Sequence, residues 1–64
     1  MPMIECNSRK IVGRLQREGW IGIGGAKHEQ FVHPKRPDVL IVVPRHRTIS
    51  TGVARGIAKT AGWI

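Results

Sequence analysis

The 64-residue sequence has no tyrosine, one phenylalanine, one cysteine and four acidic residues. Because Cys6 has no second cysteine to pair with, an intramolecular disulfide or a thiolate zinc cluster is excluded, which favours a reducing compartment such as the cytoplasm. No apolar run reaches the ~18 residues of a membrane span, and the N-terminus lacks a signal-peptide pattern. A chain this short forms one domain, residues 1–64, without a deep substrate cavity.

Positive charge dominates what remains, with eleven Lys and Arg against four Asp and Glu and a net charge of +7 at pH 7. So dense a charge attracts nucleic acid, an anionic membrane or an acidic protein. The cations fall in three patches: residues 9–17, the pair Lys35 and Arg36, and the pair Arg45 and Arg47. The last patch precedes a predicted helix, whose free N–H groups favour a phosphate, whereas simple solvation is the alternative for every patch.

Apolar spacing and capping residues predict five secondary-structure elements. Asn7 or Ser8 suits an N-cap and Gly19 a helix end, which predicts a helix over residues 9–18. Strands are expected at residues 20–23, 27–33 and 39–43, and a second helix at residues 51–61.

The connections and the order of these elements predict an α+β fold. The glycines at 24 and 25 suit a hairpin, while two prolines within residues 33–38 predict an unpaired basic turn. The strand at 39–43 has no polar alternation, which predicts a central, covered position. The order α-β-β-β-α is then most simply a three-stranded antiparallel sheet with both helices on one face and the other face open for a ligand.

Strand alternation singles out one histidine. If Phe31 faces the core, Glu29 and His33 share its side, whereas His28 points to the open face. An exposed imidazole on a basic sheet is a candidate general base for phosphodiester cleavage, although an exposed histidine is more often only solvated.

The other candidate residues have weaker cases. His33 precedes a proline and is expected to serve the turn, while His46, between two arginines, suits phosphate contact as well as proton transfer. Metal binding is not expected, because His28 and His33 lie on opposite faces and no acidic cluster supplements them. Trp20 and Trp63 suit the core better than base stacking.

Several strings along the chain resemble one family. They are Ser8-Arg9-Lys10 leading a short helix to Glu18-Gly19-Trp20, then His28-Glu29-Gln30-Phe31 with His33-Pro34, a Val-rich strand ending at Pro44, and a last helix closing with Ala61-Gly62. From about Ser8 onward the chain is similar to the HicA toxins of bacterial toxin–antitoxin pairs.

This resemblance implies a double-stranded-RNA-binding-like fold, an RNA-cleaving activity that blocks translation, and inhibition by a cognate HicB-like antitoxin. The catalytic histidine of the family follows a Gly-Ser pair at the start of the second strand, and His28 matches that position. The chain departs from the family pattern in having Ala26-Lys27 in place of Gly-Ser, and Glu29 where a second histidine is common.

The sequence therefore predicts a cytoplasmic endoribonuclease toxin that cleaves mRNA without a metal or cofactor. His28 is the predicted base, and the predicted RNA-binding residues are Lys27, Lys35, Arg36, Arg45 and Arg47. Two alternatives remain at this stage. One is a non-catalytic RNA- or DNA-binding module, for which the charge alone suffices, and the other is an inactive toxin relic that binds its antitoxin.

Overall fold

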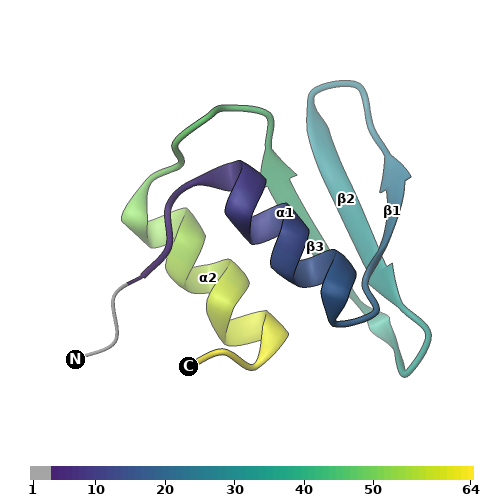
Figure 1. Cartoon of the computed structure of the whole chain (residues 1–64). Coiled ribbons are helices and arrows are strands. Elements are labelled where there is room, and N and C mark those ends of the chain that lie inside the picture. The colour runs from purple at the N-terminus through teal and green to yellow at the C-terminus, as the bar shows by residue number, and fades with distance from the viewer. Residues whose placement is uncertain (1–3) are drawn as a thin grey trace.

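The computed structural model describes residues 4–64 and contains two helices and three strands. Their order is α1 (Ser8–Arg17), β1 (Ile21–Gly24), β2 (His28–His33), β3 (Arg36–Pro44) and α2 (Thr51–Ala61). The strands form one antiparallel sheet in the order β1-β2-β3, and both helices lie across the same face of it (Figure 1). The predicted α-β-β-β-α fold is thus confirmed.

Local sequence explains where the helices begin and end. The side chain of Asn7 accepts a hydrogen bond from the Lys10 amide at 3.1 Å, which satisfies one of the free N–H groups at the start of α1. Ser50 caps α2 in the same way through the Val53 amide. Gly19 and Gly62 follow the two helices with φ of +95° and +84°, values that favour glycine.

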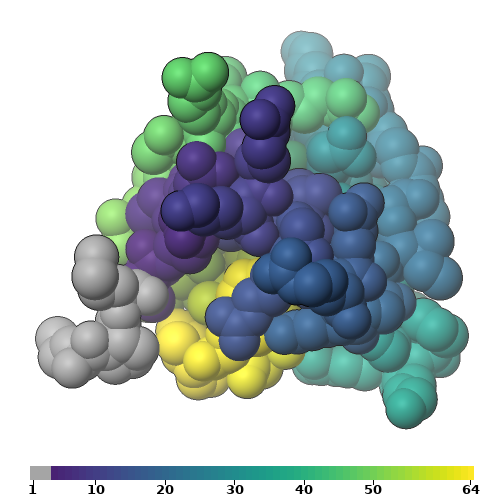
Figure 2. Space-filling model, in the orientation of Figure 1, coloured from purple at the N-terminus to yellow at the C-terminus, as the bar shows by residue number. Residues whose placement is uncertain are grey.

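The core lies between the sheet and the helices. Phe31 and Ile41 face each other across β2 and β3 and pack with Ile11 and Leu15 of α1. These four side chains are at most 2 % exposed. Trp20 also belongs to this core, as expected. In the space-filling view α1 lies across the front, with the C-terminal end of the chain beside it (Figure 2).

The outer face of the sheet has no covering layer within residues 4–64. Its cross-strand rows bring together aliphatic side chains that stay half exposed: Ile21, Ile23, Leu40 and Val42. The open face therefore carries a set of exposed aliphatic side chains.

Two predictions about β3 were wrong. This strand lies at the edge of the sheet, and β2 is the central strand. The predicted unpaired turn over residues 33–38 is also shorter, because β3 begins at Arg36, which pairs with His33. The ladder then shifts register between Val32 and His33, so that the next pair is Val32 with Leu40. Pro37 falls within this irregular stretch of an edge strand, where its missing N–H costs no ladder bond.

Candidate functional site

His28 is the first residue of the central strand and pairs with Pro44, the last residue of β3. Its side chain is exposed and shares the open face with Gln30 and Val32, as the alternation around Phe31 predicted. The imidazole is therefore at one end of the sheet, accessible to a large substrate.

Arg45 holds the turn that precedes His28. Its Nη2 donates to the carbonyl oxygen of Gly25 at 2.7 Å, and its Nη1 lies 3.4 Å from Oε1 of Glu29. Gly25 and Glu29 lie on either side of His28 in the sequence, so one guanidinium group contacts the backbone before it and the carboxylate after it. The sequence predicted Arg45 as an RNA contact, and the structure adds this internal role.

The segment that follows β3 is tied to the start of α1. Ser8 donates through its backbone N–H to the carbonyl oxygen of Arg47 at 2.9 Å, and the Ile49 amide donates to the Cys6 carbonyl at the same distance. An isolated β-bridge joins Asn7 and Thr48. These bonds bring residues 45–47 next to the N-terminus of α1.

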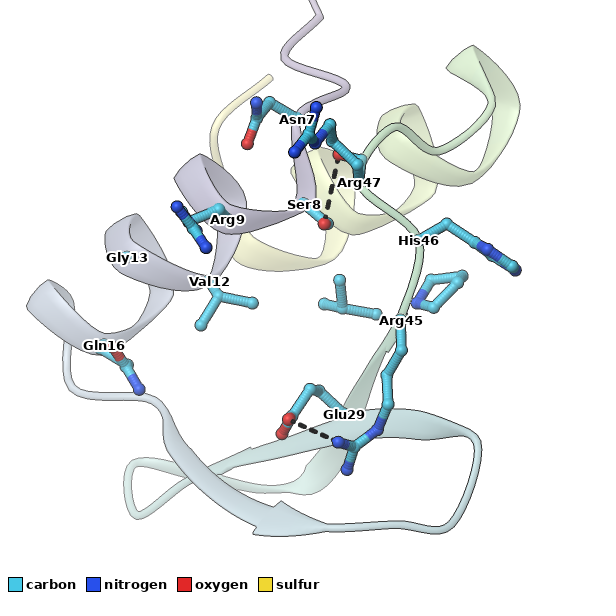
Figure 3. Close-up of a pocket in the computed structure, with 12 residues that line it drawn as sticks. Asn7, Ser8, Arg9, Val12, Gly13, Gln16, Glu29, Arg45, His46 and Arg47 are labelled. Carbon is cyan, nitrogen blue, oxygen red and sulfur yellow. Dashed lines mark hydrogen bonds and ion pairs between the residues drawn. The ribbon is translucent and has the colours of Figure 1, made fainter.

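An open groove of about 800 Å³ lies between α1, the ends of β2 and β3, and this segment. It is lined by twelve residues: Asn7, Ser8, Arg9, Val12, Gly13, Gln16, Glu29, Val43, Pro44, Arg45, His46 and Arg47. Figure 3 shows Arg9, Val12 and Gln16 on the helix side, opposite Glu29 and Arg45, while the His46 ring points outward. The groove thus opens on the helix side of the sheet, one residue from His28.

The predicted cations divide between the two ends of the sheet. Lys27 is exposed and directly precedes His28, and Arg45 and Arg47 follow the strand end that pairs with His28. Lys35 instead lies in the β2–β3 turn and Arg36 is the first residue of β3, both at the opposite end of β2. Arg36 also donates to the carbonyl oxygen of Thr60 at 2.6 Å.

The other two histidines have different surroundings. His33 accepts a hydrogen bond from the Lys35 amide at its Nδ1, and its Nε2 lies 3.0 Å from the carbonyl oxygen of Glu18. Its ring packs edge-on against Trp20 at 5.1 Å between centroids. The hydrogen bond from the Lys35 amide confirms the prediction that His33 stabilises the turn. His46 is exposed and lines the groove.

Glu18 is the acidic group with a displaced pKa. The indole N–H of Trp63 donates to its Oε1 at 2.7 Å, and Arg14 pairs with its Oε2 at 3.1 Å. The hydrogen bond from Trp63, followed by that of Arg14 and the charges of Arg14 and Arg17, holds the pKa of Glu18 below its usual value, against some desolvation. Arg14 also stacks over the Trp63 ring at 4.3 Å. This cluster joins the C-terminus to α1 and is away from His28.

Comparison with protein families decides the class. Residues 8–63 match the family model described as the HicA toxin of bacterial toxin–antitoxin systems. The chain belongs to the HicA toxin family. A comparison with curated proteins gives no significant match. As a HicA toxin, the protein has the toxin role of a toxin–antitoxin system, and the family implies a cognate antitoxin as its partner.

Two features are absent from the described residues. Within residues 4–64, no three His, Cys, Asp or Glu side chains gather in a way that could hold a metal ion. No helix of that part of the chain is long and apolar enough to cross a membrane.

Sequence reasoning missed two residues of the groove. Arg9 was assigned only to a helix patch, and Glu29 was noted for its departure from the family pattern. Helical spacing alone places Arg9 on the surface of the helix, but it does not tell which end of the sheet lies next to Arg9. The one available signal was strand alternation, which puts Glu29 on the helix side.

Proposed function

We propose that this HicA toxin is an endoribonuclease that cleaves mRNA, with His28 as general base and without a metal or cofactor. The observation that carries the proposal is the exposed imidazole of His28 at the end of the sheet, directly after Lys27 and paired with the strand end that Arg45 and Arg47 follow. The resemblance to the HicA toxins implies that His28 is at the catalytic position. Such cations attract and orient a polyanion at the base.

The proposed reaction starts at a ribose 2′-hydroxyl. A ring nitrogen of neutral His28 takes its proton, and the 2′-oxygen attacks the adjacent phosphorus in line with the 5′-oxygen. The bond from phosphorus to the 5′-oxygen breaks, which leaves a 2′,3′-cyclic phosphate and a 5′-hydroxyl. The proton of that hydroxyl comes from water or from a lysine, for which Lys27 is the nearest candidate in sequence. Lys27 and Arg47 stabilise the charge that develops on the phosphate oxygens.

Arg45 contributes in this proposal mainly through position. Its guanidinium is already bonded to Gly25 and paired with Glu29, so its free N–H groups are fewer than those of Arg47. Lys35 and Arg36 lie a strand length away and contact a longer RNA outside the cleavage site.

The reaction is tested with two oligonucleotides of one sequence, one RNA and one carrying 2′-O-methyl groups throughout. We expect cleavage of the RNA alone, unchanged in EDTA, with products that end in a cyclic phosphate and a 5′-hydroxyl. DNA stays intact because it lacks the attacking oxygen. Cleavage of the methylated strand, or loss of activity in EDTA, would contradict this chemistry.

The antitoxin is proposed to act by covering the site. No segment among residues 4–64 shields His28, so restraint comes from a second protein. An acidic, HicB-like surface would compete with phosphate for residues 45–47 and bury His28. The aliphatic side chains of the open sheet face offer apolar area beside it.

A further inference from the structure

The groove between α1 and the end of β3 combines an apolar floor with charged ends. Val12 and Pro44, both partly exposed, supply the apolar surface, on which a flat base can pack. Arg9 and Arg47 lie towards the N-terminus of α1, and Arg45 lies at the other end (Figure 3). A groove of this composition suits a nucleotide chain, which alternates flat bases with phosphates.

The guanidinium groups of Arg9 and Arg47 differ from several others in the chain. Arg14, Arg36 and Arg45 make hydrogen bonds to protein groups. Within residues 4–64, the side chains of Arg9 and Arg47 make no hydrogen bond or ion pair, and both are exposed on the groove. Their donors remain available for the oxygens of a ligand.

Glu29 is the one acid among the twelve lining residues. Its charge is partly offset by Arg45 at 3.4 Å, and its other oxygen has no partner within residues 4–64. A carboxylate accepts hydrogen bonds and repels phosphate, so in a site for nucleic acid it favours the amino group of a base.

We propose that this groove binds single-stranded RNA next to the cleaved phosphodiester. Arg9 and Arg47 bind its phosphates, a base packs on Val12 and Pro44, and Glu29 accepts a hydrogen bond from an exocyclic amino group. The inference rests on the proposed RNA cleavage and adds the strand's path and a base preference. Pro44 lines the groove and pairs with His28, so a strand that leaves the groove here and turns around the end of the sheet reaches the imidazole on the open face.

A substitution at Gly13 can fill the groove without changing the charge of the protein. Gly13 lines it, and a Cβ added there meets only the flexible end of Arg17, at 3.5 Å. Gly56 is a matched control, because it is also in a helix, is exposed, lies outside the groove, and has nothing within 4 Å of an added Cβ. Leucine favours helix over glycine at both positions, so both variants are expected to fold.

RNA binding is measured by fluorescence anisotropy in the His28→Ala background, which separates binding from cleavage. We expect Gly13→Leu to weaken binding of a single-stranded RNA by about tenfold, the equivalent of 1.4 kcal/mol. Gly56→Leu is expected to bind within about twofold of its parent. Thermal melts confirm that both variants are folded.

Arg9 is tested against Arg55, an exposed arginine on α2 outside the groove. We expect Arg9→Ala to reduce the slope of log affinity against log salt by about 0.7, the value for one lost phosphate contact on a single strand. Arg55→Ala leaves the slope unchanged.

The base preference is tested with oligocytidine and oligouridine of equal length, which differ in the amino group that Glu29 is proposed to bind. His28→Ala protein is expected to prefer oligocytidine by roughly fivefold or more. Adding Glu29→Gln removes most of that preference, because the amide both donates and accepts.

The inference and the proposed function fail in different ways. If wild-type protein cleaves RNA but Gly13→Leu and Arg9→Ala bind it as tightly as their parents, the groove is not the RNA path. If these variants lose affinity only for an antitoxin, the groove belongs to the protein partner and the inference is overturned. If the groove variants weaken RNA binding while wild-type protein never cleaves, the groove stands and catalysis is wrong.

Discussion

At the scale of single residues, Arg45 connects the segments that precede and follow His28. Its contacts reach 20 residues back to the Gly25 carbonyl and also to the Glu29 carboxylate, on either side of His28. Lysine has one nitrogen in place of the planar fork and cannot hold both groups in the same geometry. Arg45 therefore ties the turn before His28 and the carboxylate after it to the end of β3.

Gly25 tests how strictly this turn must be held. Its φ is +143°, and an added Cβ would collide with the carbonyl oxygen of His28. We expect Gly25→Ala to destabilise the fold by about 1–3 kcal/mol in thermal or urea unfolding and to lower RNA cleavage. Gly24→Ala is the control, since its φ is also positive, at +82°, but nothing lies within 4 Å of the added Cβ. Equal cleavage by the two variants would show that the turn does not set the position of His28.

Residue-level prediction worked where one strand's alternation decides the outcome. The prediction takes Phe31, the one phenylalanine, to face the core, and strand alternation then gives His28 and His33 opposite orientations; Phe31 is indeed buried. The partners of Arg45 and the place of Arg9 depend on contacts between distant segments. No spacing rule within one strand or helix contains that information.

At the scale of elements, α1 and the C-terminal segment are joined by Glu18. It accepts from Trp63 and pairs with Arg14, which itself stacks on Trp63. The Trp63 backbone N–H also bonds to the carbonyl oxygen of Ala58, at the end of α2. These contacts fix the two helices side by side on the sheet.

This cluster predicts a pH dependence of stability. Because the folded-state pKa of Glu18 is lowered, chiefly by Trp63, the unfolded chain binds the proton first as pH falls. The stabilisation is complete above about pH 4.5, the ordinary value, and is lost as pH falls through the folded pKa. We expect the Tm of Glu18→Gln to change less between neutral and acid pH than that of wild type. Asp38→Asn, which removes an exposed acid outside the cluster, serves as control. An acid response of Glu18→Gln equal to that of wild type would contradict the assignment.

The five elements could be predicted because capping residues and apolar spacing are local signals, and the second helix has the predicted bounds Thr51–Ala61. The position of β3 could not be predicted in this way. A continuous apolar run normally indicates a strand covered on both faces, but here Leu40 and Val42 are 49 % and 37 % exposed on the open face. The apolar run fits a surface for a partner as well as it fits a buried strand.

At the scale of the whole molecule, the two sides of the sheet differ in character. The helix side carries the cationic groove, and the outer side carries half-exposed aliphatic residues of β1 and β3. His28 lies at the end of the sheet where these surfaces meet. Net charge alone favours nucleic acid, an anionic membrane or an acidic protein as partner, whereas the separation of the two surfaces required the three-dimensional register.

The antitoxin complex should show this division in amide hydrogen exchange. We expect binding of the cognate antitoxin to protect residues 27–31 and the strands β1 and β3. The reason is that the antitoxin surface covers His28 and the aliphatic side chains of the open face. High salt should weaken the complex, since part of the contact is with residues 45–47. Protection confined to α1 and α2, with residues 27–31 unchanged, would mean that restraint does not work by covering the base.

The central claim is that His28 is the base of an RNA-cleaving toxin, and the most direct measurement compares His28→Ala with His46→Ala in a cleavage assay on purified RNA. Both histidines are exposed, so neither substitution creates a cavity, and circular dichroism melts should match wild type. We predict that His28→Ala loses cleavage by a factor of about 100 or more, the usual contribution of a general base, while His46→Ala retains most of it. A folded His28→Ala protein that cleaves RNA as fast as wild type would contradict the account.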